Sequence, residues 1–367
     1  MADNRYTRAK RTFKQWIKDR ILVEEKLPAI YIYDQEYIYK RKRMKRLGFI
    51  SLAKLEEQGP KYFLPHERTF AGPKEDRFRL MKEVRANLSP IFSVFSDDGN
   101  KINQFLSNYI RMHKPIIDIE FERVKHKVCR MSDKAKIMKL VRFMRDKQAL
   151  IADGHHRYEV ALKFRNLMRR ASRNNSERYD YVMMYFATSD KNGLTILPTH
   201  RMVEGISKAN FRKNMAKLKE FFDIIKTMDK RRMFTLMGAK DKRVFGVYLG
   251  GKDCLCLLLK KKAVHNFIRM RRSAHWKNLD VVILHNLILE KAFGIKGKDA
   301  EKAIYFTRDS KTAFDWVDAG KDRAAFFLNP PRLEDVKKIA QYRERMPHKT
   351  TYFYPKPLSG LVINKLE

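Results

Sequence analysis

The stretch IADGHHRYEVALKF, residues 151–164, passes from one type of secondary structure to another within a few positions. An apolar, strand-like run ends at Asp153, and Tyr158, Ala161 and Phe164 then recur on one face of a helix. The polar residues 153–157 therefore occupy a strand-to-helix turn. Gly154 suits such a turn because it adopts positive φ at no steric cost. This pattern predicts a fold that mixes helices and strands.

A turn of this kind is suited to binding an anion. The backbone amides and the dipole at a helix N-terminus favour negative charge, and Arg157 adds a guanidinium that binds two oxygens at once. Phosphate is therefore the expected ligand. Asp153 is either part of this site or only the N-cap of the helix, which is the commonest role of an aspartate just ahead of a helix.

The adjacent histidines, His155 and His156, do not suit a shared metal ion. Neighbouring helical residues point about 100° apart, whereas histidine pairs that bind metal prefer i, i+4 spacing. We expect one imidazole to donate a hydrogen bond to a phosphate oxygen while the other packs or caps the helix.

A second polar cluster lies in LPHERT, residues 64–69. His66, Glu67 and Arg68 bring acidic and basic side chains together. Most clusters of this kind are explained by ion pairs on the surface. If this loop meets the turn at 153–157, however, Glu67 is placed to orient a hydroxyl nucleophile. Asp153 would then hold magnesium or accept the proton of that hydroxyl.

The rest of the chain also alternates between helical and strand-like segments. We expect a helix over 7–20, a hairpin within 29–54, a helix in NFRKNMAKLKEFFDII (210–225) and a second hairpin from GVYLGG and DCLCLLLKKK (246–262). The fold class is therefore α+β, or mixed α/β. A boundary near residue 205 divides the chain into a domain at 1–205, which carries both motifs, and a C-terminal α+β domain at 206–367, whose last strand is expected to return to the site.

Charge and cysteine content limit the partners and the compartment. The 367 residues include 80 Lys and Arg against 42 Asp and Glu, a net charge of +38, with the cations in short runs spread along the chain. Such a surface attracts nucleic acid, acidic membranes or phosphorylated metabolites. The alternative is that the charge has no functional meaning and reflects only the codon usage and solubility requirements of the source organism. Three cysteines without disulfide-framework spacing indicate a reducing compartment, the cytoplasm. With no apolar run of about 18 residues, we expect no membrane span.

Several motifs together resemble one family. ADGHHRYE resembles the signature of the bacterial and archaeal family known as domain of unknown function 1015. LPHERT, GPKEDR, RANLSPIF, DYVMMYF, LPTHR and MPHKTTYFYPKPLSGLVI follow that family's pattern in the expected order. Val160 and His348 depart from its commonest residues, and the family's usual N-terminal segment is not found, so part of the site is expected to be missing.

The resemblance implies a fold and a reaction. The DGHHR motif is similar to that of archaeal free-serine kinases, whose fold is shared with ParB and sulfiredoxin and whose G-x-x-R motifs contact nucleotide phosphates. Gly154 and Arg157 match that pattern. The resemblance thus implies a ParB/sulfiredoxin-like core and transfer of phosphate from ATP or ADP, with Mg²⁺, to a small hydroxyl acceptor such as serine.

The residues of the predicted site follow from the turn, the loop and this resemblance. The predicted catalytic residues are Asp153, Glu67 and His156, with Asp153 also the magnesium ligand, and the predicted phosphate-binding residues are Gly154, His155, Arg157, Arg68 and Lys349. Lys349 is included because a proline-stiffened, aromatic-rich terminal strand can bring a cation near phosphates, although ordinary packing is the alternative. The alternative function is a ParB-like nucleotide-binding protein that associates weakly and non-specifically with DNA.

Overall fold

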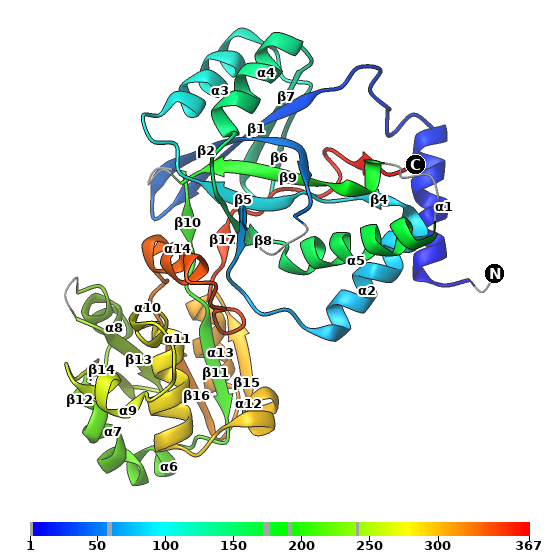
Figure 1. Cartoon of the computed structure of the whole chain (residues 1–367). Coiled ribbons are helices and arrows are strands. Elements are labelled where there is room, and N and C mark those ends of the chain that lie inside the picture. The colour runs from blue at the N-terminus through cyan, green and yellow to red at the C-terminus, as the bar shows by residue number, and fades with distance from the viewer. Residues whose placement is uncertain (1–2, 57–60, 172–176, 190–192, 240–241) are drawn as a thin grey trace. The chain divides into compact units, whose positions relative to one another are not determined.

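The computed structural model describes residues 3–56, 61–171, 177–189, 193–239 and 242–367, which form two compact units (Figure 1). The first unit comprises residues 1–195 and 353–367, and the second comprises 196–352. The boundary falls within β10 (Thr195–Ile196) and just before β17 (Phe353–Tyr354). The chain thus leaves the first unit before residue 205 and comes back to it for its last residues.

An eight-stranded sheet forms the centre of the first unit, in the order β3-β8-β5-β9-β2-β1-β7-β6. Its strands are rich in aromatic and branched side chains, which suit a pleated surface. They are β1 (Ile30–Tyr39), β2 (Lys42–Lys54), β3 (Phe63–Pro65), β5 (Ile91–Phe95), β6 (Ile117–Phe121), β7 (Val124–Met131), β8 (Ala149–Asp153) and β9 (Tyr181–Thr188). A short ladder of β4 (Ala86–Asn87) and β18 (Asn364–Lys365) holds the C-terminus to the same unit.

The predicted hairpin is confirmed as β1 and β2, with a shorter turn than the basic run suggested. Tyr39 pairs with Lys42, so only Lys40 and Arg41 form the turn, both with positive φ. This conformation matches the twist of the two strands it joins. The remaining basic residues of the run, including Arg46, belong to β2.

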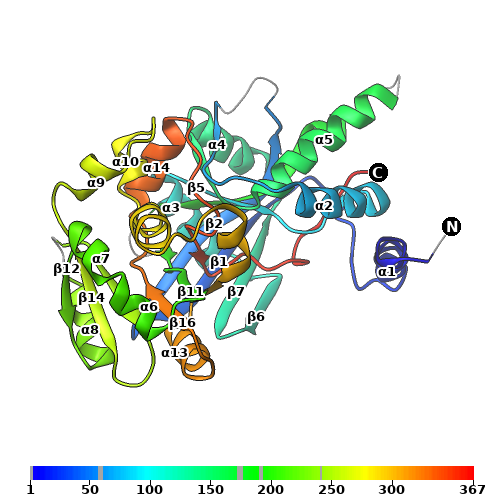
Figure 2. The same cartoon turned by 90° about the horizontal axis from the view of Figure 1, so that it is seen from below.

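Helices cover one face of this sheet with an apolar core. Side chains of α3 (Lys101–Met112), α4 (Lys134–Met144) and α5 (His155–Ala171) join one buried cluster with Ile32, Phe49 and Ile151. The helix predicted at the N-terminus is α1 (Arg5–Lys18), which packs on α2 (Ala71–Val84), itself beside α5 (Figures 1 and 2). Because side chains alternate across a strand, Tyr33 and Gln35 of β1 project from the opposite face.

The second unit is also mixed, around a six-stranded sheet of order β12-β14-β13-β16-β11-β15. The strands are β11 (His200–Glu204), β12 (Phe222–Lys226), β13 (Val244–Tyr248), β14 (Cys254–Leu259), β15 (Ile304–Thr307) and β16 (Arg323–Phe327). The helices are α6 (Lys208–Lys213), α7 (Met215–Phe221), α8 (Lys230–Met237), α9 (Ala263–Phe267), α10 (Ala274–Lys277), α11 (Asp280–Ile283), α12 (Gly297–Ala303), α13 (Ser310–Asp318), α14 (Leu333–Gln341) and a π-helix (Leu284–Ala292).

One predicted element of the second unit is wrong in part. The continuous helix expected over 210–225 is interrupted after Lys213 and ends at Phe221, and its last residues form β12, paired antiparallel to β14. Tertiary pairing therefore overrides local periodicity, because Phe222 gains a buried place in the sheet. The hairpin of β13 and β14 is confirmed.

The fold class is α+β, as the sequence predicted. The more specific ParB/sulfiredoxin-like core stays a prediction. Among the described residues, no helix is both long enough and apolar enough to cross a membrane.

Candidate functional site

The turn between β8 and α5 has the predicted strand-to-helix geometry. β8 ends at Asp153, α5 begins at His155, and Gly154 between them has φ of +96°. A Cβ atom at position 154 would lie 2.9 Å from Nε of Arg157. Glycine is therefore required twice here, for its backbone conformation and for the space that the arginine fills.

Asp153 lies between two cations. Its Oδ2 accepts a hydrogen bond from Nη2 of Arg157 at 2.7 Å, and its Oδ1 pairs with Nζ of Lys356 at 2.5 Å. Within the part of the chain that the structure describes, this carboxylate accepts nothing from the first amides of α5, so it does not act as the helix cap. The first turn of α5 thus begins beside a carboxylate held by two basic side chains.

Arg157 is fixed by its surroundings. Nη1 donates to the carbonyl oxygen of Pro90 at 2.8 Å, while Nη2 holds Asp153. Burial lowers the pKa of this guanidinium, and the charge of Asp153 opposes that change. The planar group is therefore held in one orientation at the mouth of the turn, as a clamp for an oxyanion requires.

The neighbouring strand is irregular at the same level. Asp153 pairs with Phe92 of β5, whereas Ile151 pairs with Ser93, so the register shifts by one residue between them. Such bulges re-aim side chains at the end of a strand. This shift sets the direction in which Asp153 leaves the sheet.

The loop that contains LPHERT does meet the turn. The backbone N–H of His66 donates to Nε2 of His155 at 3.2 Å, and that of Phe70 donates to Nε2 of His156 at 3.1 Å. The rings of His66 and His155 also stack edge to face at 4.6 Å between centroids. The contact left open by the sequence is therefore made through two histidines and two backbone amides.

A second set of contacts fixes this loop one helical turn further on. Glu159 of α5 accepts hydrogen bonds from the hydroxyl of Thr69 at 2.8 Å and from Nζ of Lys74 at 3.1 Å. Burial lowers the pKa of His156, an effect partly opposed by Glu159. A neutral His156 that accepts at Nε2 carries its proton on Nδ1, which is then its donor atom.

The other predicted residues differ in position. Glu67 is half-buried and Arg68 is exposed, both on the loop between β3 and α2. Lys349 belongs to the second unit, where its Nζ lies 4.4 Å from the centre of the Phe306 ring. The structure thus groups 153–157 with the loop at 66–74, and it assigns Lys349 to the other unit.

The sequence reasoning missed Lys356, the second cation beside Asp153. Lys356 sits in a C-terminal segment that lies against the sheet face opposite the helices. Nε2 of Gln35 donates to the carbonyl oxygen of Lys356 at 3.1 Å, and the N–H of Leu358 donates to the hydroxyl of Tyr33 at 3.2 Å. The detectable signal was a lysine between two prolines, Pro355 and Pro357, whose backbone is stiff.

Arg46 adds a third cation beneath this segment. It is 1% exposed, donates to Gln35 and to the carbonyl oxygen of Pro355, and lies 4.4 Å from the centre of the Phe92 ring. Its Nη1 is buried with no hydrogen-bond partner among the described residues. A buried arginine without a carboxylate partner makes its surroundings favourable for an anion.

The site has the donors for a phosphate group and one carboxylate for a metal ion. The described residues hold no group of three or more metal-binding side chains. Mg²⁺, however, is commonly bound by one or two carboxylates together with substrate phosphates and water. Asp153 fits that role, because its oxygens are hard ligands at the place where a phosphate would be held.

The family that the sequence motifs resemble also matches this chain through its family model. The model of the family described as Protein of unknown function (DUF1015) matches residues 1–282. One similar solved structure is a free serine kinase mutant in complex with ADP, with 12% sequence identity, a TM-score of 0.42 and a match that covers 86% of this chain and 92% of that chain. Another is SbnI from Staphylococcus aureus with a C-terminal truncation, with 10% identity, a TM-score of 0.43 and coverage of 86% of this chain and 87% of that chain. A conserved hypothetical protein from Pyrococcus furiosus is also similar, with 13% identity, a TM-score of 0.41 and coverage of 86% of this chain and 95% of that chain. No curated protein matches the chain.

Proposed function

This chain belongs to the DUF1015 family, and we propose that it is a nucleotide-dependent kinase that phosphorylates the hydroxyl group of a small metabolite, with free serine the first candidate. The observation that carries the proposal is the position of Asp153, a carboxylate held by Arg157 and Lys356 at the start of α5. Phosphoryl transfer depends mostly on positioning and on electrostatic stabilisation, and these groups are suited to both.

The phosphates of ATP or ADP would lie at the N-terminus of α5. Arg157 supplies a fixed guanidinium, and Gly154 allows the backbone to approach the phosphates closely. Lys356 would exchange Asp153 for a phosphate oxygen when the nucleotide binds. His155 is assigned to the same phosphate site, and Arg68 and Lys349 stay predicted members of it.

Asp153 would then act on the acceptor hydroxyl or on the metal ion. Mg²⁺ would supply neutralisation of the charge on the transferred phosphate, and Asp153 would hold it. Without a metal contact, Asp153 would accept the proton of the hydroxyl. Glu67 would orient that hydroxyl, and His156 would assist through its Nδ1 proton. A cytoplasmic location belongs to the same proposal.

The direct test is a phosphorylation assay with the full chain. Purified protein is incubated with ATP or ADP, Mg²⁺ and a panel of hydroxyl-bearing amino acids, and the products are identified by mass spectrometry. We expect phosphoserine, formed by the wild-type protein and not after Asp153→Asn. Nucleotide binding without any phosphorylated product from a wider metabolite panel would contradict the kinase assignment.

Lys356 gives a prediction that the sequence did not contain. Lys356→Ala should lower nucleotide affinity about tenfold, because one charge-assisted hydrogen bond to a phosphate is lost. Calorimetry measures the affinity of this variant and of Lys349→Ala. A loss for Lys349→Ala would support the sequence-based assignment of Lys349, whereas an unchanged affinity for Lys356→Ala would remove Lys356 from the site.

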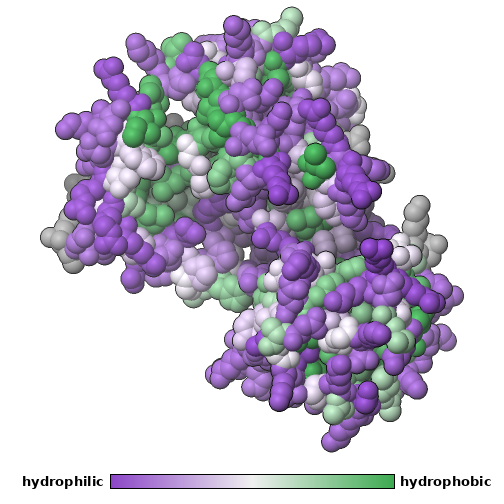
Figure 3. Space-filling model, turned by 180° about the vertical axis from the view of Figure 1, so that it is seen from behind, coloured by the Kyte–Doolittle hydropathy of each residue, from purple (hydrophilic) through white to green (hydrophobic). Residues whose placement is uncertain are grey.

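The net charge of +38 favours a second candidate function, association with nucleic acid. Figure 3 shows that hydrophilic side chains cover most of the face drawn, in agreement with a surface rich in charge. Lysine and arginine spread in this way bind phosphate backbones without reading bases. The candidate is a ParB-like protein that binds nucleotide and DNA without turnover.

For this candidate we expect weak, sequence-independent DNA binding that falls steeply as salt rises, because binding releases counterions from the DNA. Fluorescence anisotropy with two unrelated duplexes, each titrated at several salt concentrations, measures both properties. Equal affinities and a steep slope are expected. A sequence-selective complex that tolerates salt would instead place specific DNA recognition ahead of the kinase.

A further inference from the structure

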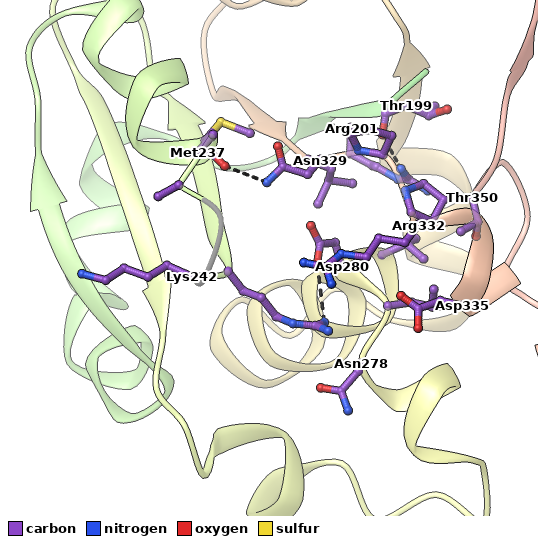
Figure 4. A pocket seen from close by; sticks show the side chains of 18 residues that line it. Thr199, Arg201, Met237, Lys242, Asn278, Asp280, Asn329, Arg332, Asp335 and Thr350 are labelled. Carbon is purple, nitrogen blue, oxygen red and sulfur yellow. Dashed lines mark hydrogen bonds and ion pairs between the residues drawn. The ribbon is translucent and has the colours of Figure 1, made fainter. Parts of the chain in front are cut away.

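A cavity of about 380 Å³ lies within the second unit, separate from the site at Asp153 (Figure 4). Its lining comes from the residue before β11, the end of α8, the start of α11, the segment after β16 and the first turn of α14. This volume is in the range of sites for small metabolites. Neutral hydrogen-bonding groups line it as well, among them Thr199, Asn329 and Thr350.

Arg201 is the unusual member of this lining. It is 1% exposed, and its guanidinium donates only to carbonyl oxygens, that of Thr199 and, at 3.1 Å, that of Lys349. Among the described residues, its buried Nε has no hydrogen-bond partner and no carboxylate pairs with it. Burial alone lowers the pKa of Arg201 to about 9. A buried charge without an ionic partner is costly, and a bound anion would offset that cost.

The described acidic residues that line the cavity do not pair with Arg201. Of the two acids in the lining, Asp280 lies 3.7 Å from Nη1 of Arg243, and Asp335 pairs with His275 at 3.0 Å. Arg332 is exposed and makes no ion pair with a described residue. Figure 4 shows Asp280 pointing toward the space that it shares with Asn329 and Arg332. Neither Arg201 nor Arg332 is therefore in an ion pair with a carboxylate in the part of the chain that the structure describes.

We propose that this cavity binds a small polar metabolite through a phosphate or carboxylate group held by Arg201 and Arg332. Guanidinium groups suit both oxyanions, because each presents two oxygens to the planar donor fork. Thr199, Asn329 and Thr350 would bind the hydroxyl or amide groups of the same molecule. All the residues of this site belong to the second unit, whereas Asp153 and Arg157 belong to the first.

Nuclear magnetic resonance of the full-length, ¹⁵N-labelled protein tests the proposal. The buried Nε–H of Arg201 is the reporter, identified by its absence in Arg201→Lys, and the indole N–H of the buried Trp276 is the second. Inorganic phosphate and succinate are titrated separately. We expect a saturable shift of both reporters with at least one probe, and the probe that acts tells which oxyanion the cavity prefers. Both reporters belong to the second unit, and the variants described next decide whether the shift comes from this cavity.

Two variants make the result specific. Arg332→Ala should raise the dissociation constant about tenfold, since one charged hydrogen bond is lost. Arg232→Ala removes an exposed arginine of α8 in the same unit and should leave the constant unchanged. The proposal is overturned if neither probe shifts the reporters at millimolar concentration. It is equally overturned if Arg332→Ala and Arg232→Ala bind the probe with the same dissociation constant. This comparison does not depend on whether Arg201→Lys folds.

Discussion

Asp153→Asn should reduce phosphoryl transfer by at least about a hundredfold while nucleotide binding changes little. Asparagine keeps the size of the side chain and loses its charge, so it neither accepts the proton of a hydroxyl nor holds Mg²⁺ effectively. Arg157 and Lys356 would lose their carboxylate partner and become available to the phosphates, which preserves affinity. The rate is measured in the phosphorylation assay, and affinity by calorimetry.

The matched control lies at the other end of the same helix. Asp180 pairs with Arg169 near the end of α5 at 2.7 Å, so Asp180→Asn removes a similar carboxylate from a similar ion pair. It should leave the rate unchanged. An active, normally stable Asp153→Asn protein would end the catalytic assignment of Asp153, because asparagine replaces aspartate well only in a structural role such as a helix cap.

Arg157→Ala should weaken nucleotide binding itself, by about ten- to a hundredfold. This range corresponds to the roughly 1.5–3 kcal/mol of a lost charged hydrogen bond. The structure adds a second cost, because the arginine also fills the space beside Gly154 and donates to Pro90. Calorimetry with ADP measures the affinity, and thermal unfolding separates a binding defect from a folding defect.

Two further variants sharpen this prediction. Arg157→Lys keeps the charge and loses the planar fork, so we expect an affinity between those of the wild type and Arg157→Ala. Arg169→Ala breaks the ion pair at the far end of α5 and should bind nucleotide normally. Full affinity in a folded Arg157→Ala protein would show that phosphate is bound elsewhere.

Much of the candidate site was predictable because its signals are local. Gly154 has to adopt positive φ between a strand and a helix, and the sequence pattern alone places it there. The hairpin of β1 and β2 was predictable for the same reason, since alternation of side chains along a strand is a short-range property. Family membership, too, was predictable from motifs such as ADGHHRYE, and the family model confirms it.

Other features depend on residues far apart in the chain. The segment 222–226 follows a helical pattern, and only its pairing with β14 makes it a strand. Lys356 reaches Asp153 across 203 positions, because the chain returns from the second unit and is held on the sheet by Tyr33 and Gln35. The sequence analysis chose Lys349 and not Lys356 as the phosphate-binding lysine. The sequence alone does not tell which of the two structural units each lysine belongs to.

The sequence by itself therefore determined the strand-to-helix turn, the mixed fold class and the strongly positive charge, because each depends on neighbouring residues or on composition. Only the tertiary structure decided that the loop at 66–70 reaches His155 and His156 and that Asp153 binds two cations instead of capping its helix. It also decided that Arg201 is buried and that no acid among the described residues pairs with it. Long-range packing fixes which charges meet and which remain unpaired, and that information is not contained in local spacing.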